Sequence, residues 1–351
     1  MKISGPKIEF NGNQTKVSFD IEIKNRVQKL FFQSTYPIAE SISESCDAAL
    51  VGLFLPAMYG NEDIIIDGMV SDRLLHGMNN VIQDLIIINA PTVYNRVKVT
   101  RSPHYSDDNE VYEQTRNQNS IAGFSGGIDS WNLINDCLIN KSSERLSHIL
   151  FSNVGSKMIG GEKLYMERLG RIVPIAKKLG VELLDIRTNL DSFYIENKPL
   201  WYPYTGQIRN IAVGLLLQRG ISRFYLASGS DYSKTKFGNL DLSYIGALII
   251  PHFSTESMHI VLQGAQKTRL EKTICVSSIK ESYDLLDVCW RHPIYGSTEF
   301  TNCGQCGKCM TTLATLEAIG KLDLYANQFD MNAWSKVRDR YLEANRSKND
   351  K

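Results

Sequence analysis

Between residues 120 and 229, short apolar runs alternate with longer amphipathic segments, and this alternation is the feature that most constrains the fold. The runs SIAGF, HILFSNV, VELLDIR and RFYLASG are typical of buried strands, and the segments between them carry apolar residues at helical spacing. Strands that alternate with helices connect through crossovers into a parallel sheet with helices on both faces. We therefore expect an α/β fold whose ligands bind beyond the carboxyl ends of the strands.

The first hundred residues have a different pattern and predict a small α+β domain. Apolar and polar residues alternate around Asn11-Gly12-Asn13, which predicts a hairpin, and Ser71 stands where a helix N-cap is expected. Residues 102–120 are polar and poor in aliphatic side chains, as in an exposed connector. We expect residues 1–118 to form an accessory or acceptor-docking domain and residues 119–351 to form the ligand-binding domain.

Composition narrows the classes of partner. The 351 residues include 39 basic and 38 acidic side chains, so a formal charge of +1 gives no support for binding a polyanion. No apolar run approaches the length of a membrane span, and the first residues lack the apolar core of a signal peptide. The sequence predicts a cytoplasmic protein without membrane contact, and nucleic acid is not an expected partner.

The loop FSGGIDS joins the first of these strands to a helix that we expect to open at Ser130. Gly126 and Gly127 let backbone N–H groups close around phosphate oxygens, and Ser125 and Ser130 add hydroxyl donors near a helix N-terminus. Asp129 would repel a phosphate, so its presence predicts a bridging Mg²⁺ ion. The alternative is a strand-to-helix turn that needs two glycines only for its backbone angles.

The second motif is a cluster of cysteines near the C-terminus. C-x-x-C-x-x-C at residues 303–309 is preceded by a further cysteine, and seven cysteines in a reducing compartment favour metal ligation over disulfides. The predicted ligands of a structural, four-coordinate Zn²⁺ ion are Cys289, Cys303, Cys306 and Cys309. Cys275 and His292 are the alternatives to Cys289 as the fourth zinc ligand. A redox pair and an iron–sulfur cluster are the alternatives to zinc.

The SGGIDS stretch resembles the signature of the PP-loop ATP pyrophosphatases, which split ATP between its α and β phosphates. This resemblance implies that pyrophosphate lies in the loop and that adenine lies near the end of the second strand. The implied nucleotide-binding residues are Ser125, Gly126, Gly127, Ile128, Asp129, Ser130, Phe151 and Asn153. A substrate oxygen would attack the α-phosphorus, and ammonia, an amine or a sulfur donor would displace AMP from the adenylated product.

The glycine loop and the cysteine cluster together resemble 7-cyano-7-deazaguanine synthase and its relatives, over roughly residues 119 to 325. This resemblance implies a parallel five-stranded sheet of the adenine-nucleotide alpha-hydrolase type, a zinc module at about residues 285–325 and a C-terminal helix. The stretch GQIRNIAVGLLL implies that Arg209 and Asn210 lie at the site mouth, and GSDYSK implies that Asp231, Tyr232 and Ser233 lie near the substrate. Asp129, Ser125 and Arg209 are the implied catalytic residues.

In that family ATP adenylates a deazaguanine carboxylate, ammonia forms the amide, and a second ATP drives formation of the nitrile. The chain departs from the family in its substrate-facing part: position 207 is Gln and position 206 is Gly, so the proline of the family's Pro-x-Arg-Asn is absent, and KTKFGN follows Asp-Tyr-Ser. We therefore expect this chain to share the ATP chemistry of the family more closely than its substrate.

Two further groups of residues stay open. Arg269 and Lys272 would neutralise pyrophosphate or lie in solvent, and the aromatic residues of PLWYPYTG, at 199–206, would stack on a base or pack a loop.

We expect an AMP-forming ligase that joins a deazapurine-like or other small carboxylate to ammonia or an amine, with ATP, Mg²⁺ and Zn²⁺ as cofactors. A tRNA-modifying PP-loop enzyme, a protein or peptide acceptor and a non-catalytic binding module are the alternatives. The sequence leaves the oligomeric state open, with a homodimer as one option.

Overall fold

The computed structural model describes residues 1–12, 14–36, 38–103, 119–139, 146–155, 161–194, 198–290 and 300–349. Contacts within the chain group it into two compact units. The first, which we call the sheet unit, comprises Met1–Gly123, Leu146–Ser156 and Glu182–Ala265. The second, which we call the helical unit, comprises Phe124–Arg145, Lys157–Val181 and Gln266–Lys351.

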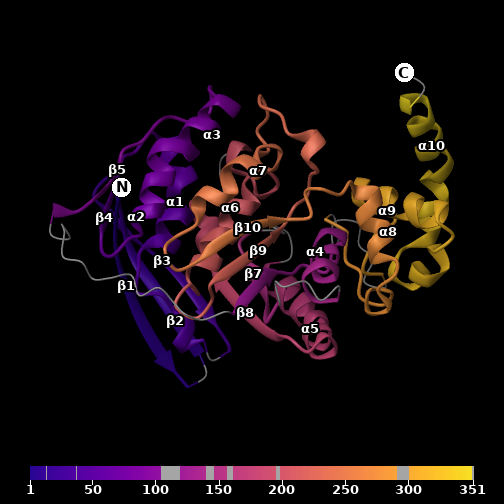
Figure 1. Cartoon of the computed structure of the whole chain (residues 1–351), viewed down its shortest axis with the longest axis horizontal. Coiled ribbons are helices and arrows are strands. Elements are labelled where there is room, and N and C mark those ends of the chain that lie inside the picture. Colours follow the sequence, from indigo (N-terminus) through magenta and orange to yellow (C-terminus); the bar gives the residue numbers. More distant parts are fainter. Residues whose placement is uncertain are drawn as a thin grey trace. The chain divides into compact units, whose positions relative to one another are not determined.

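All strands of the described residues belong to the sheet unit. They are β1 (Lys2–Asn11), β2 (Gln14–Ile23), β3 (Arg26–Ser34), β4 (Ile64–Asp67), β5 (Val99–Arg101), β6 (Ser120–Gly123), β7 (His148–Asn153), β8 (Glu182–Thr188), β9 (Arg223–Ala227) and β10 (His259–Gln263). The strands form one ten-stranded sheet in the order β10-β9-β6-β7-β8-β3-β2-β1-β4-β5 (Figure 1).

The part of the sheet from β10 to β8 is parallel throughout. Its chain order runs from β6 through β7 to β8 and then returns to the other side of β6 for β9 and β10. The strand order therefore reverses between β6 and β9, which is where ligands bind in sheets of this kind. The glycine loop follows directly in the chain after the carboxyl end of β6.

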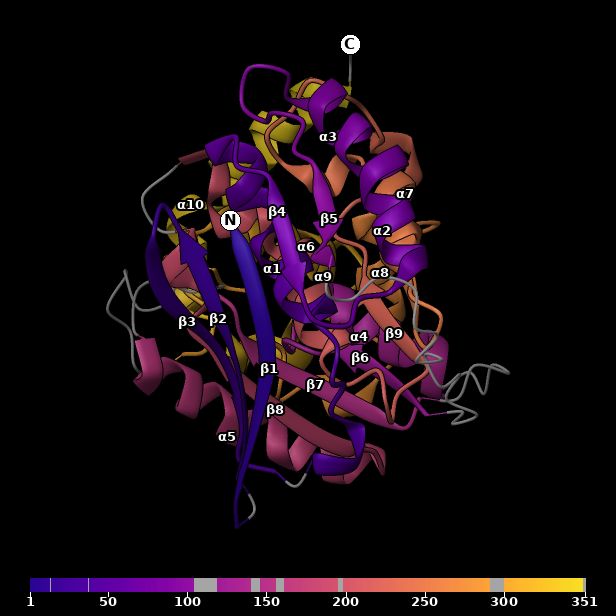
Figure 2. The same ribbon diagram turned by 90° about the vertical axis from the view of Figure 1, so that its left-hand side faces the viewer.

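The N-terminal strands continue this sheet, so it has ten strands where five were expected. β1, β2 and β3 form an antiparallel meander (Figure 2), and β3 pairs antiparallel with β8. The predicted hairpin is confirmed, because Asn11 pairs with Gln14 across the turn. A buried carboxylate reinforces the joint between β3 and β8: Asp185 accepts hydrogen bonds from Thr35 N at 3.0 Å and Thr35 Oγ1 at 2.8 Å. We call this joint the β3–β8 seam.

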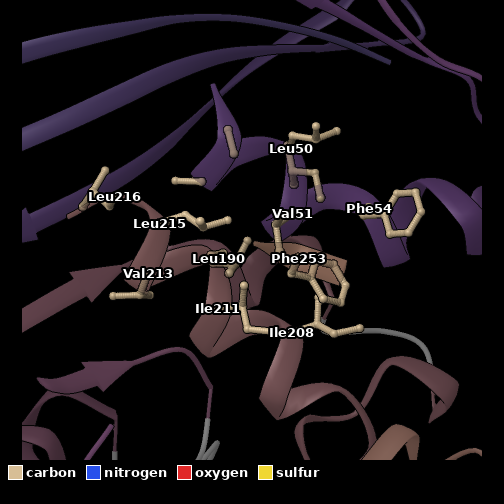
Figure 3. Close-up of a cluster of buried hydrophobic side chains, with 14 of the residues drawn as sticks. Leu50, Val51, Phe54, Leu190, Ile208, Ile211, Val213, Leu215, Leu216 and Phe253 are labelled. Atoms are coloured by element: carbon tan, nitrogen blue, oxygen red, sulfur yellow. The ribbon is translucent and has the colours of Figure 1, made fainter. Parts of the chain in front are cut away.

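The core of the sheet unit is centred on helix α1 (Asp47–Gly60) and helix α6 (Tyr202–Leu215). Helix α1 is apolar on almost every side, and a helix of this kind is stable only when other elements surround it. Leu50, Val51 and Phe54 of α1 lie against Ile208 and Ile211 of α6 (Figure 3).

Three shorter helices complete the sheet unit: α2 (Asp72–Gly77), α3 (Gln83–Asn89) and α7 (Gly246–Ile249). The predicted N-cap of α2 is confirmed, because Ser71 Oγ accepts a hydrogen bond from Leu74 N at 3.0 Å.

The helical unit contains α4 (Ile128–Ile134), α5 (Gly161–Leu179), α8 (Arg269–Val276), α9 (Gly307–Ala318) and α10 (Met331–Asn349). Helix α4 packs on α8, and α9 packs on both α8 and α10. Helix α5 is amphipathic, with buried residues such as Leu169, Ile172 and Ala176 spaced three or four apart. Among the helices described here, none has the length and apolar character that crossing a membrane would require.

The domain boundary predicted at residues 118 and 119 falls at the edge of residues 104–118, which lie outside the described residues, and it stays a prediction. The contacts divide the chain in another way, because residues 1–123 share one compact unit with β7, β8, β9 and β10. Hydrogen bonding along the continuous sheet is the physical reason for this grouping.

We expect the substitution Asp185→Ala to lower the free energy of unfolding by about 3 kcal/mol, because it removes the buried acceptor of the N and Oγ1 donors of Thr35. Urea unfolding followed by circular dichroism would measure the loss. Asp20→Ala is the control: Asp20 pairs with exposed Lys7 on the surface, and its loss is expected to cost less than about 1 kcal/mol. Equal losses in the two variants would contradict the importance of the β3–β8 seam.

Candidate functional site

The glycine loop, Phe124 to Ser130, begins the helical unit. Gly126 has a φ of +78°, a backbone conformation that favours glycine, and Gly127 is the N-cap of α4. Helix α4 starts at Ile128, two residues before the predicted start, and a π-helical turn, Asn135–Ile139, continues it. The loop thus leads directly into a helix N-terminus, as in phosphate-binding loops.

The two serines of the loop differ in how accessible their hydroxyl groups are to a ligand. Ser125 is exposed, whereas Ser130 is buried and its hydroxyl donates a hydrogen bond to Gly127 O at 2.9 Å. In this structure the hydrogen of the Ser130 hydroxyl closes the first turn of the helix. The role of both serines as hydroxyl donors to a ligand stays a prediction.

Asp129 is held between two cations from α8. Arg269 NH1 donates to Asp129 Oδ2 at 2.7 Å, and Lys272 Nζ donates to Asp129 Oδ1 at 3.4 Å. The start of α8 is fixed by a reciprocal capping box between Thr268 and Glu271, and residues three apart on a helix share one face. Local helix chemistry therefore brings Arg269 and Lys272 to the same carboxylate.

The charges around Asp129 favour the binding of an anion. Burial alone would raise the pKa of Asp129, but the attraction of Arg269, Lys272 and Lys308 outweighs it and holds this pKa below its ordinary value. The carboxylate therefore stays ionised through neutral pH, and its ion pairs are lost only when the pH falls through that lowered pKa. Arg269, Lys272 and Lys308 therefore outnumber the carboxylate that they surround.

The four predicted metal ligands come together in the helical unit. The sulfur atoms of Cys289, Cys303, Cys306 and Cys309 are buried and all lie within 4.8 Å of one another. The Sγ atom of Cys306 lies 3.4 Å from that of Cys309 and 4.0 Å from that of Cys289. Helix α9 begins directly after Cys306, so its first turn places Cys309 beside Cys306. These four thiols can hold a metal ion.

The other cysteines of the described residues lie outside this group. Cys275, which competed for the fourth position, lies in α8 and is absent from the cluster; His292 lies outside the described residues. Cys46 is a buried thiol of the sheet unit that donates to Gly5 O at 3.1 Å, and burial raises its pKa to about 12. Such a neutral thiol serves packing.

The residues predicted near adenine lie in the sheet unit. Phe151 and Asn153 are in β7, and between them Ser152 Oγ donates to Asn210 Oδ1 of α6 at 2.9 Å. Asn210 also donates to Tyr202 OH at 3.2 Å. The structure thus joins the predicted substrate residue Asn210 to the carboxyl end of β7.

Arg209 does not lie at a site mouth. Its side chain is 1% exposed and donates to Val154 O at 3.0 Å, Leu200 O at 2.6 Å and Thr205 Oγ1 at 3.0 Å. It also forms an ion pair with Asp191, and its guanidinium lies 3.9 Å from the ring centre of Tyr194. These interior partners occupy the guanidinium in this structure, and the predicted catalytic role of Arg209 stays a prediction.

The other predicted substrate residues follow β9. Asp231 Oδ1 accepts from Ser233 N at 3.1 Å, and Lys234 pairs with Oδ2 at 3.2 Å, so Asp231 caps a short 3-10 turn. Hydrogen bonding from Ser233 lowers the pKa of this carboxyl. Asp231 and exposed Tyr232 line a pocket of the sheet unit together with Ser228, Ser230, Thr235, Ser243, Ala247, Leu262 and Ala265.

Sequence patterns did not identify several residues around the loop and the thiols. Asp287 N donates to Gly126 O at 2.8 Å, and the amide of Asn302 holds the backbone next to Cys289. Lys308 was not identified from the sequence either. Their only sequence signal is position: Asp287 lies two residues before one predicted ligand, Asn302 immediately precedes another, and Lys308 lies between two.

No family model matches the sequence, and no curated protein matches it. Among the solved structures that align with the chain are two of low sequence identity. The U34-tRNA thiolase NcsA from Methanococcus maripaludis, with its 4Fe–4S cluster, is 14% identical with a TM-score of 0.34, covering 64% of this chain and 73% of that one. Glutamine-dependent NAD⁺ synthetase from Acinetobacter baumannii, in complex with adenosine diphosphate, is 12% identical with a TM-score of 0.24, covering 97% and 78%. Scores this low carry no conclusion about function.

We expect Cys306→Ser to abolish stoichiometric metal binding and to lower the yield of soluble protein, because the four thiols are buried and a bound ion would stabilise the region around them. Elemental analysis of the purified variant would measure the loss. Cys275→Ser, in the same unit but outside the cluster, should keep the metal content of the unmodified protein. A Cys306→Ser protein with full metal content would show that the cluster is not the metal site.

Proposed function

We propose that this chain is an ATP-dependent, AMP-forming ligase that adenylates a carboxylate on a small molecule and joins it to ammonia or an amine. The observation that carries the proposal is the glycine loop at a helix N-terminus, with Arg269 and Lys272 converging on Asp129 beside it. Loop amides, a helix start and excess positive charge together favour the polyphosphate of a nucleotide.

The loop residues and the cations have separate roles in this proposal. The backbone around Gly126 and Gly127 and the exposed Ser125 hydroxyl would bind the β and γ phosphates as a unit. Asp129 would not touch the phosphates; it would hold Arg269 and Lys272 in place, so that their remaining N–H groups face the anion. Groups that are fixed before reaction stabilise developing charge without reorganising.

The reaction balances without a covalent intermediate on the protein. A carboxylate oxygen of the substrate attacks the α-phosphorus of ATP, and the bond from that phosphorus to the bridging oxygen breaks. The electron pair leaves with pyrophosphate, where the cations neutralise it. The nitrogen of ammonia or an amine then attacks the acyl carbon, loses a proton and expels AMP. Positioning and charge neutralisation supply most of the rate in such a step.

The Asp129 carboxylate does not fit the predicted role of a free Mg²⁺ ligand. Both of its oxygens accept hydrogen bonds from cations, and those cations also remove the repulsion that led us to expect a bridging ion. The proposed reaction therefore needs no magnesium ligand from this side chain.

We propose that Cys289, Cys303, Cys306 and Cys309, which we call the thiolate site, hold one zinc ion with a structural role. Zinc with Zn–S bonds of about 2.3 Å in tetrahedral geometry places its sulfur atoms about 3.8 Å apart. The separations of 3.4 Å and 4.0 Å lie on either side of this value. A 4Fe–4S cluster binds each thiolate to a different iron and spaces the sulfur atoms more widely. Four thiolates also leave no open coordination position for catalysis.

The loop assignment is tested by Asp129→Asn. We expect pyrophosphate release to drop at least about tenfold, or about 1.4 kcal/mol of transition-state stabilisation, because the neutral amide no longer holds the two cations. A coupled phosphate assay would follow release with ATP and a panel of small carboxylates plus ammonia. Asp323→Asn changes an exposed carboxylate of the same unit and should leave the rate within about twofold.

The same assay separates the classes of acceptor. Stimulation by a small carboxylate with ammonia supports the proposal, whereas stimulation by tRNA alone, or by a protein acceptor alone, contradicts its small-molecule substrate. Unchanged release by Asp129→Asn would reduce Asp129 to a turn residue.

The metal assignment is tested on the purified chain without added metal. We expect one zinc per chain and a colourless protein, because the filled d shell of zinc gives no visible absorption. Elemental analysis and an absorption spectrum would measure both. A brown protein with stoichiometric iron would instead show that the four thiols hold an iron–sulfur cluster.

A further inference from the structure

The segment before the first metal-ligating cysteine lies directly against the glycine loop. Asp287 N donates to Gly126 O at 2.8 Å. A Cβ atom added to Gly126 would meet the Asp287 Cβ and the Leu285 carbonyl oxygen at 3.5 Å each, and one added to Gly127 would meet the Asp287 carbonyl oxygen at 3.4 Å. Residues 285–287 therefore form one wall of the loop, and this wall continues to Cys289 two residues later.

Asn302 fixes this segment on the side of the metal site. The Asn302 side chain is fully buried, and its Oδ1 accepts from Val288 N at 2.8 Å and Cys289 N at 3.0 Å. Its Nδ2 donates to Leu286 O at 2.8 Å and to Gln328 O at 3.0 Å. The next residue is the ligand Cys303, so one side chain sets the spacing between the first two ligands.

Asp287 also anchors the wall to α5. Its carboxylate forms an ion pair with Arg168, and both side chains are nearly buried, with 9% and 12% of their surfaces exposed. Asp287 thus makes two long-range contacts: its backbone reaches the glycine loop, and its side chain reaches α5. Removing the charge of a buried partner in such a pair leaves the other ion poorly compensated.

We propose that the thiolate site positions the glycine loop, so that metal binding and phosphate binding are coupled through residues 285–289. Asp287 and Asn302 are the positioning residues of this connection. The inference rests on the proposed function, in which the loop binds the phosphates of ATP.

The coupling follows from the way the segment is held. A metal ion fixes Cys289 relative to the cysteines of residues 303–309, and Asn302 transmits that placement to Leu286 and Val288. When the wall of residues 285–287 is fixed at the end next to Cys289, it keeps the Gly126 backbone in its phosphate-binding conformation. Coupling between two binding sites is reciprocal, so a phosphate ligand that orders the loop must tighten metal binding by the same factor.

The test uses the metal-loaded full chain and inorganic pyrophosphate. Titration with a chromogenic zinc chelator gives the apparent metal affinity, and we expect saturating pyrophosphate to raise it at least about tenfold. In Asp287→Asn all four cysteines remain, so one metal per chain should be retained, but the effect of pyrophosphate should fall below about threefold. Amide hydrogen exchange of residues 120–130, with metal bound, should be faster in this variant than in the unmodified chain.

Asp323→Asn, measured at the same pyrophosphate concentration, is the matched control and should behave like the unmodified chain. Calorimetry establishes separately whether pyrophosphate binds. Binding of pyrophosphate without a change in metal affinity would overturn the coupling and leave the proposed function intact. Full coupling in Asp287→Asn would overturn the assignment of Asp287 as a positioning residue of this connection. No binding of pyrophosphate or ATP by the metal-loaded chain would overturn the proposed function, and the coupling with it.

Discussion

The ion pairs of Asp129 with Arg269 and Lys272 are the interaction on which the candidate site depends. They join the start of α4 to the start of α8, and each helix start is set locally, by Gly127 and by the Thr268–Glu271 capping box. A carboxylate beside a phosphate loop is unfavourable when it stands alone. Held between two cations it becomes part of an anion site, because the positive charges outnumber it and it restricts their side chains.

Much of this organisation could be predicted from the sequence, because its signals are local. Strands β7 and β8 have hydrophobic patterns that identify them, and their observed bounds differ from those of the runs HILFSNV and VELLDIR by no more than one residue at either end. The spacing of Cys303, Cys306 and Cys309 predicts a shared ligand group whatever the surrounding fold is, because two intervening residues can return the chain to the same ion.

The remainder depends on contacts between residues far apart in the chain, and local patterns do not encode them. Nothing around Arg209 shows that its guanidinium lies in the interior, where the carbonyl groups of Val154 and Leu200 accept its hydrogen bonds. A resemblance in short motifs therefore placed it at a ligand. The pairing of β3 with β8 could not be predicted either. The pattern of apolar residues in a strand shows which face of the strand is buried, but it does not show which strand lies beside it.

The distance along the chain between the two sides of the site has a consequence for biosynthesis. Asp129 and Arg269 are separated by 140 residues, and the wall formed by residues 285–287 comes later still. On a ribosome the glycine loop emerges long before the residues that fix its conformation, and non-local contacts of this kind form late in folding. The site that we propose for a nucleotide is therefore incomplete in a growing chain until residues 269–287 have been synthesised.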